Sequence, residues 1–204
     1  MLQLILAVVF DVQGFRGNNK EFIIKEISIV DLNKHHVIQT FFKEPYNINE
    51  LNVARRNEVR WLSKRYHGIE WSYGFIAYDE IGELLRCVLL NYSTIYIKGC
   101  EKKNILEAYL SSGDTYKFEI IDIDSFHSES LKAMRIDRGN NKCFYHQNLN
   151  SSYVCSHENV YNLVDVVNQH RNAKCGNTSS DKGIHLAECQ TDCFRSEERR
   201  VGKE

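Results

Sequence analysis

Two cysteine–histidine pairs stand close together in the C-terminal half of the chain and could bind a metal ion. Cys143 and His146 are separated by two residues, and Cys155 and His157 by one. Structural zinc takes four such ligands in a tetrahedral arrangement, which two closely spaced pairs can supply. The asparagine-rich stretch between the pairs has little apolar content, so a bound ion would stabilise it. The pattern predicts a structural zinc site; the alternative is that Cys155 is a small core residue and His157 an opening residue of the last helix.

Basic side chains gather at two places in an otherwise neutral chain. The 204 residues carry 26 lysines and arginines against 27 aspartates and glutamates, which excludes a strongly basic nucleic-acid-binding arm or an acidic tail. Arg56, Arg60 and Lys64 recur at four-residue spacing in one expected helix, and Lys98 and Lys103 form a second group. A cleft between such groups could hold phosphates, although overall neutrality predicts weak, salt-sensitive binding. The alternative is that the helix charges are a solvated face.

Aromatic residues follow the first basic group and could stack on bases. Trp71 and Tyr73 stand in a glycine-containing loop directly after that helix, and base–aromatic stacking is a common mode of single-strand binding. The alternative is that these rings belong to the core. Trp61 falls at core spacing within the helix itself, so we expect it to be packed inside.

The elements that must position these residues begin with strands. Residues 2–10 are apolar, and we interpret them as a buried strand, because no lysine or arginine precedes them and no cleavage site of small residues follows. Turn-compatible segments connect this strand to two more, so the three are expected to be an antiparallel meander. The remaining expected elements are helices 49–65 and 77–90, strand 92–98, helix 101–110, strand 117–122 and helices 125–134 and 157–169; the second and third strands are 21–31 and 36–42.

This order predicts an α/β fold. Three antiparallel strands followed by alternating helices and strands form a mixed sheet flanked by helices, with the first and fourth strands as parallel neighbours. Ligands of such sheets gather at the carboxyl ends of the strands. Asp11 stands at one such end and Lys98 at another, so a site is expected there.

The chain is expected to contain one domain, residues 1–170. Residues 171–194 are polar and lack periodicity, which is typical of a disordered tail. Residues 195–204 resemble the translation of a sequencing-library adapter and are set aside. Seven cysteines at irregular spacings indicate reduced thiols, in the cytoplasm or nucleus, and the apolar N-terminal run is too short to span a membrane.

Three segments resemble motifs of the ribonuclease H-like superfamily, in the branch of 3′–5′ exonucleases that use four acidic residues. They are Asp11-Val-Gln13, residues 97–106 and residues 153–163. The resemblance implies a ribonuclease H-like mixed sheet in which carboxylates hold two Mg²⁺ ions for phosphodiester hydrolysis. Residues 1 to about 170 are also similar to short uncharacterised arthropod proteins, and this resemblance gives no indication of an activity.

Three of the four acids that the resemblance calls for are replaced. Asp11 matches the first acid, whereas Gln13, Lys103 and Asn159 stand at the other three positions, and Lys98 begins the second motif. These replacements leave too little negative charge for two Mg²⁺ ions, and a lysine there would repel them. We therefore expect a nuclease fold without nuclease activity, in which Lys98 or Lys103 pairs with Asp11.

Three functions remain open at this point. The first is a catalytically inactive domain that binds nucleic acid or a protein through the former active-site cleft; for nucleic acid the expected residues are Gln13, Arg56, Arg60, Lys64, Lys98 and Lys103. The second is an active Mg²⁺-dependent exonuclease in which Asp11 is joined by Glu101, Asp122 and Glu158, with Asp124 nearby. The third is a zinc-stabilised protein-interaction module. Lysines around Asp11 would favour the first, clustered acids the second and a closed neutral cleft the third.

Overall fold

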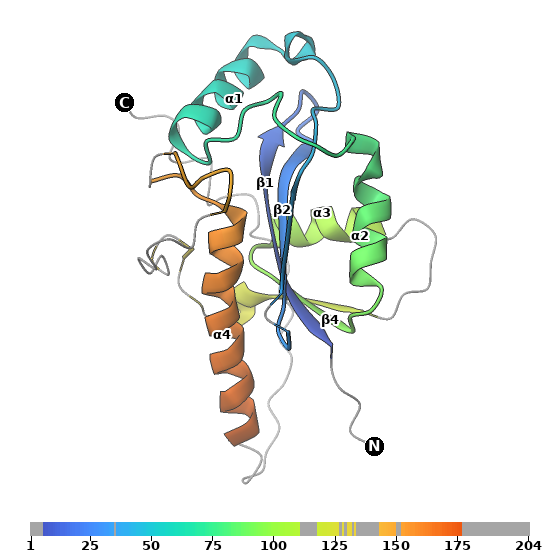
Figure 1. Ribbon diagram of the computed structural model, residues 1–204, viewed down its shortest axis with the longest axis vertical. Helices are drawn as coiled ribbons and strands as arrows, with labels where there is room; N and C mark the ends of the chain where they lie inside the picture. The colour runs from blue at the N-terminus through green and yellow to red at the C-terminus, as the bar shows by residue number, and fades with distance from the viewer. Residues whose placement is uncertain are drawn as a thin grey trace.

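Five strands form a single mixed sheet with helices on both faces (Figure 1). The computed structural model describes residues 6–34, 36–110, 118–126, 128, 130, 131, 133, 143–149 and 152–176. The strands are β1 (Ala7–Arg16), β2 (Phe22–Asp31), β3 (Val37–Phe41), β4 (Thr94–Ile97) and β5 (Glu119–Asp122). The helices are α1 (Val53–Arg65), α2 (Ile81–Leu89), α3 (Cys100–Leu110) and α4 (Ser156–Gly176), with 3-10 turns η1 (Ile48–Glu50), η2 (Tyr78–Glu80) and η3 (Ile123–Phe126).

The strand order across the sheet is β3-β2-β1-β4-β5. β2 is antiparallel to both β1 and β3, whereas β4 is parallel to β1 and β5 is parallel to β4. The expected antiparallel meander and the parallel pairing of the first and fourth strands are both confirmed. An α/β fold with a mixed sheet is therefore present.

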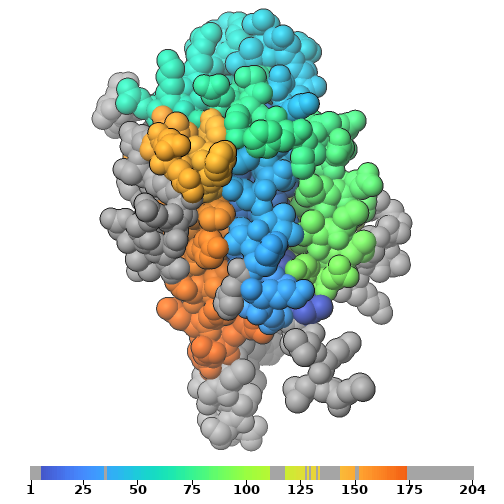
Figure 2. Space-filling model, in the orientation of Figure 1, coloured from blue at the N-terminus to red at the C-terminus, as the bar shows by residue number. Residues whose placement is uncertain are grey.

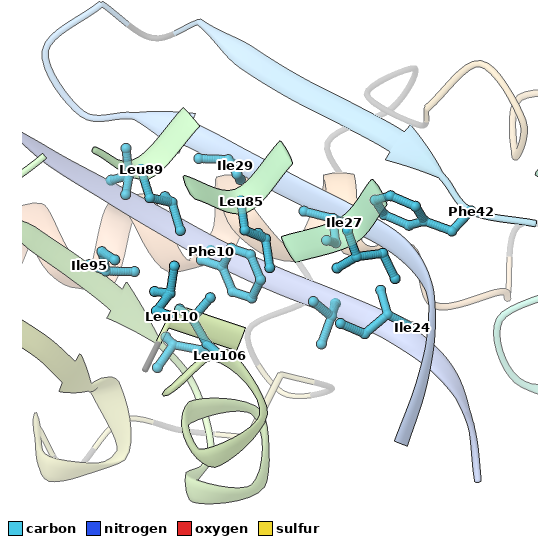
Figure 3. Packing of buried hydrophobic residues seen from close by; sticks show 14 residues of the cluster. Phe10, Ile24, Ile27, Ile29, Phe42, Leu85, Leu89, Ile95, Leu106 and Leu110 are labelled. Carbon is cyan, nitrogen blue, oxygen red and sulfur yellow. The ribbon is translucent and has the colours of Figure 1, made fainter. Parts of the chain in front are cut away.

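Alternate residues of β1 face two different cores. Phe10 and its neighbours at even positions pack against α2 and α3, and Figure 3 shows Phe10 at the centre of this cluster, between Leu85 and Leu106. Ala7 and Val9 point to the other face, where the apolar stripe of α4 covers them. Because both faces are covered, β1 is buried along nearly its whole length.

A β-bulge in β2 reverses the alternation of that strand, so that Ile24 and Ile27 both face the core with α2 and α3. Gln13 pairs with Glu26 and Gly14 with Ile24, so Lys25 is the extra residue. The Lys25 side chain is fully buried, and its Nζ donates to the carbonyl oxygen of Trp71 at 2.7 Å. Burial lowers the pKa of Lys25 to about 8. The bulge ties β2 to the loop that follows α1.

Several elements differ from the sequence-based expectations. β1 continues to Arg16, beyond the expected end at residue 10, because it stays paired with β2 after its pairing with β4 has ended. For the expected helix 125–134, the described residues show only the turn η3 and isolated turn positions. The last helix runs to Gly176, past the expected domain end at residue 170, and residues 177–204 lie outside the described residues.

The prediction that Trp61 packs in the core is wrong. Val59 is the buried residue of α1, Leu62 lies partly buried beside it, and Trp61 is 53% exposed. The inward stripe of the helix therefore passes through positions 59 and 62, which turns position 61 outward. None of the helices in the described part of the chain combines the length and apolar character needed to cross a bilayer.

Candidate metal centre and the Asp11 site

A row of buried polar side chains lies on the sheet face beneath the first turn of α4. Asp11 and Gln13 of β1 pair with Ser28 and Glu26 of β2, so all four share one face, and all four are buried. The row is connected to the helix by Ser28, whose hydroxyl lies 2.7 Å from that of Ser156. Farther along α4 the same face is apolar. The polar residues are therefore confined to the part of the sheet under the N-terminus of α4.

Both carboxylate oxygens of Asp11 have protein partners. Oδ1 accepts from Nζ of Lys102 at 2.5 Å, and Oδ2 accepts from Nδ2 of Asn159 at 2.8 Å. Asp11 itself is fully buried, whereas the side chain of Lys102 is 21% exposed. The pairing of β1 with β4 ends at Phe10, which leaves room beyond it for a side chain from α3. Asn159, in the first turn of α4, thus lies beside Asp11.

The lysine beside Asp11 is not one of the two expected. Lys98, at the end of β4, is buried and pairs with Asp124, while its Nζ also donates to Ser128. Lys103 pairs with Glu107 one turn along α3. Lys102 is in the first turn of α3, and one residue later the helix has rotated by about 100°, away from β1. The expected ion pair is present with Lys102 in place of Lys98 or Lys103.

The acids expected for an active nuclease are not gathered around Asp11. Glu101 accepts a hydrogen bond from Arg16 at 2.8 Å. Asp122 accepts from the backbone N–H groups of Gly99 and Asp124 at 2.9 and 3.0 Å. Glu158 lies half-buried in the first turn of α4. Among the described residues, the group of side chains that could hold a metal ion lies elsewhere.

The residues expected to contact nucleic acid are divided between buried and exposed positions. Gln13 and Lys98 are 5% and 8% exposed. Arg56 uses its guanidinium to bind the carbonyl oxygens at positions 49 and 51. Arg60 and Lys64 lie on the exposed side of α1. Of the expected stacking residues, Trp71 is buried in the core and donates through Nε1 to a backbone carbonyl.

Four buried side chains could hold a metal ion: Glu26, Cys143, His146 and Cys155. Their ligand atoms all lie within 4.8 Å of one another. Cys143 Sγ is 2.8 Å from Nδ1 of His146, and Cys155 Sγ is 3.6 Å from Oε1 of Glu26. The ligands come from β2, from the segment 143–149 and from the residue just before α4. An ion at this place would join three parts of the chain that are distant in sequence.

The second nitrogen of His146 also has a partner. Nε2 lies 2.6 Å from the carbonyl oxygen of His67, which can accept only, so Nε2 carries the proton in the neutral ring. Nδ1 faces Cys143, and although burial acts to lower the pKa of His146, the hydrogen bond to Cys143 and nearby Glu26 raise it. A cation bound at Nδ1 would displace the proton shared with Cys143. Metal-binding histidines are usually held in this way by a second partner that fixes the tautomer and the ring orientation.

The charges within this group are strongly coupled. Hydrogen bonding from Cys155, together with His146, lowers the pKa of Cys143 to about 4. The same bond to Cys143, together with burial, raises the pKa of Cys155. Burial raises the pKa of Glu26 to about 7. One thiolate thus coexists with a thiol that keeps its proton and a carboxyl group that is only partly ionised near pH 7, and a cation would favour the ionised form of all three.

His157, the expected fourth ligand, lies outside this group. It belongs to α4, and its ring contacts that of Tyr161 edge-on with the centroids 5.2 Å apart. Sequence reasoning missed Glu26 because it lies in the middle of a strand, 129 positions before Cys155. One signal was available: Lys25 and Glu26 are adjacent charges inside an apolar strand, and buried charges are rare unless they are paired or bind metal.

His67 connects the metal-binding group to the end of β1. Its ring is fully buried, with Nε2 3.2 Å from the carbonyl oxygen of Gly14 and Nδ1 accepting from the N–H of Ile69 at 3.1 Å. Burial lowers the pKa of His67 to about 3. The ring is therefore neutral near pH 7. A second proton on Nδ1 would also face the N–H group of Ile69, which donates to that nitrogen.

Most of the described cysteines are free thiols. Cys87 is exposed and Cys143 and Cys155 are buried, and all three are unbridged. Cys100 is disulfide-bonded, so the expectation of reduced thiols holds for three of the four cysteines whose side chains the structure describes.

A scan of protein-family models and a search of curated proteins find no match to this chain.

Proposed function

We propose that this chain is a ribonuclease H-like domain that has lost nuclease activity and serves as a binding domain for nucleic acid or a protein. The strand order β3-β2-β1-β4-β5, with β2 antiparallel and β4 and β5 parallel to β1, supports the fold assignment. It is the arrangement that the resemblance implies, with Asp11 on the central strand.

The observation that carries the loss of activity is the occupation of both Asp11 oxygens by Lys102 and Asn159. Two-metal hydrolysis needs several carboxylates around a pair of Mg²⁺ ions. Here an ammonium group already neutralises the one carboxylate, an amide takes the place of another acid, and Asp11 is closed to solvent. A divalent ion would have to displace the ammonium group and then share its site with an uncompensated positive charge.

A nuclease assay tests this proposal. The full chain and the variant Asp11→Asn would be incubated with end-labelled single-stranded DNA and RNA in Mg²⁺, Mn²⁺ or EDTA. We expect no shortening of the oligonucleotide in any condition. Metal-dependent shortening that disappears in Asp11→Asn would overturn the proposal, whereas shortening that persists in the variant would indicate a contaminating enzyme.

Restoring the acids tests the fold assignment separately. The variant Gln13→Glu/Lys102→Asp/Asn159→Asp gathers four carboxylates at and around position 11 of β1. Lys102 is replaced rather than Lys103, the position that the resemblance calls for, because Lys102 is the lysine that contacts Asp11. We expect the variant to bind Mn²⁺ in calorimetry and to melt at a higher temperature when Mn²⁺ is added, while the parent chain does neither. A folded variant without Mn²⁺ binding would contradict the assignment, and Lys102→Asp alone provides a second, less charged variant should the triple one fail to fold.

We further propose that the group of Glu26, Cys143, His146 and Cys155 binds a structural zinc ion. Two sulfurs, one imidazole nitrogen and one carboxylate oxygen are ligand types that zinc accepts, and four protein ligands in a buried place describe a closed, structural site. Around tetrahedral zinc, two sulfurs lie about 3.8 Å apart. The separations here are all within 4.8 Å, so none needs to shrink by more than about 1.5 Å. The 2.8 Å between Cys143 Sγ and Nδ1 of His146 would lengthen to about 3.5 Å around the ion.

The zinc would hold the segment 143–149 against the sheet. This segment contributes Cys143 and His146, and the tyrosine between them packs against Phe41 and Tyr73. Glu26 also accepts a hydrogen bond from the N–H of Ser156 at 3.2 Å, and this bond connects the ligands to the N-terminus of α4. The ion would thus fix the start of α4, and with it the position of Asn159 beside Asp11.

Metal analysis of purified variants tests the ligand set. We expect one zinc ion per chain, lost in Cys143→Ser and His146→Ala and weakened at least tenfold in Glu26→Gln. His157→Ala is the matched control, since it removes the other candidate ligand, and it should keep its zinc. Zinc retained in Glu26→Gln but lost in His157→Ala would show that the ligand set is the one expected from sequence spacing; no zinc in the parent chain would overturn the site.

A further inference from the structure

The outer side of α1 carries two large aromatic side chains that water reaches. Trp61 is 53% exposed and Tyr66, which follows the helix, is 40% exposed. Their rings are nearly parallel, with the centroids 6.3 Å apart and an interplanar angle of 19°. A tryptophan left this exposed presents a large apolar surface, and exposed apolar groups among polar ones often mark a binding site.

Three basic residues surround these rings. Arg60 and Lys64 are four residues apart, as are Trp61 and Arg65, so all four lie on the same side of the helix, opposite the buried Val59. All three basic side chains are exposed. We call the surface formed by Arg60, Trp61, Lys64, Arg65 and Tyr66 the α1 face. Figure 2 shows α1 at the surface, next to the segment 143–149.

The charge of the α1 face is not neutralised within the described part of the chain. Helix α1 contains five basic residues and one acidic residue, Glu58, and Glu58 pairs with Arg55. No ion pair among the described residues includes Arg60, Lys64 or Arg65. The face is therefore positively charged, although the whole chain has a formal net charge of −1.

We propose that the α1 face binds single-stranded nucleic acid, an inference that rests on the proposed binding role of the domain. Unpaired bases can stack on Trp61 and continue the ring pair that it forms with Tyr66, while Arg60, Lys64 and Arg65 contact the phosphates. A duplex would offer the phosphates but keep its bases stacked inside, so it would use only the cations. This site lies on the outside of the molecule and is separate from the buried Asp11.

Tryptophan fluorescence and anisotropy measure this binding directly. The chain has two tryptophans, and Trp71 is only 6% exposed, so quenching by a ligand reports on Trp61. The full chain would be titrated with labelled 20-nucleotide oligo(dT) and oligo(U) at several salt concentrations. We expect binding to quench the fluorescence of Trp61 and to weaken as salt is added. For three phosphate contacts on a single strand, a plot of the logarithm of the binding constant against the logarithm of the salt concentration should have a slope of about −2.

Variants of exposed residues separate stacking from charge. Trp61→Ala should weaken binding about tenfold or more, whereas Trp61→Phe keeps a ring and should retain most of the affinity. Arg60→Glu/Lys64→Glu should abolish most binding and flatten the salt dependence. Lys43→Glu is the control for a charge reversal outside the α1 face, with half the charge change of the double variant. Lys43 is exposed on the loop after β3, and this variant should bind nearly as the parent does.

Two results would overturn the proposal. One is unchanged affinity in both Trp61→Ala and Arg60→Glu/Lys64→Glu; the other is no binding to either oligonucleotide at low salt, which would point to a protein partner for this face. A duplex bound as tightly as the single strand would overturn the stacking role. The same reactions analysed for shortened oligonucleotide test the proposed loss of nuclease activity independently, since shortening can appear with or without binding at α1.

Discussion

Removing the ammonium group beside Asp11 should destabilise the domain more than removing the carboxylate. The variant Lys102→Met leaves a fully buried carboxylate with Asn159 as its remaining hydrogen-bond donor among the contacts described above. Breaking a buried ion pair in this way costs about 3–5 kcal/mol. We expect a value near the lower end, about 3 kcal/mol, because the Lys102 side chain is 21% exposed and water can approach the pair.

Removing the carboxylate of Asp11 should cost less, because the Lys102 ammonium group that remains lies closer to solvent. In Asp11→Asn the lysine can turn toward solvent, so we expect a loss of about 1.5–2 kcal/mol, at the low end of the cost of a lost hydrogen bond to a charged group. The double variant Asp11→Asn/Lys102→Met should be about 2 kcal/mol more stable than the sum of the two single effects predicts, because no uncompensated charge remains. Urea unfolding followed by fluorescence gives all four free energies of unfolding.

Lys103→Met is the matched control for this experiment. It removes a lysine from the neighbouring position, where the partner is Glu107 on the same exposed helix surface at 3.9 Å. Such pairs contribute little, so we expect a change within about 0.5 kcal/mol. Equal effects of Lys102→Met and Lys103→Met, or strictly additive effects in the double variant, would refute the reasoning and show that Asp11 does not depend on the ammonium group.

Three further predictions concern residues that support the site. The pKa of His67 falls from 6.5 to about 3 on folding, so between these pH values the unfolded chain binds one more proton than the folded chain. The free energy of unfolding should therefore decrease below pH 6.5, by at most about 1.4 kcal/mol per pH unit. Urea unfolding at pH 7.5 and at pH 5 should show a smaller difference in His67→Gln than in the parent chain. Gly14→Ala should lose several kcal/mol in the same assay, since the new Cβ would lie 2.0 Å from the carbonyl oxygen of Ile23. Leu85→Ala, in the core between α2 and the sheet, should lower the unfolding free energy by about 3–5 kcal/mol without loss of zinc.

Local patterns in the sequence were enough to predict most elements of the fold. The strand-forming runs, the amphipathic pattern of α2 and the order of elements predicted the mixed sheet and the parallel pairing of β1 with β4, because alternation and helical periodicity are properties of neighbouring residues. The spacing of Cys143 and His146, with Cys155 nearby, likewise identified three of the four members of the buried group. These residues are close in sequence, so their proximity in space needed little of the remaining fold.

The tertiary structure decided which distant residues complete each site. Glu26 reaches the cysteines because strand register places it on the sheet face of Gln13 and because the start of α4 packs over that face. Lys102 rather than Lys103 faces Asp11, since the point at which α3 begins sets the direction of every side chain on it. The sequence alone determined the kinds of residue available, whereas registry between elements, to within a single residue, determined which of them meet.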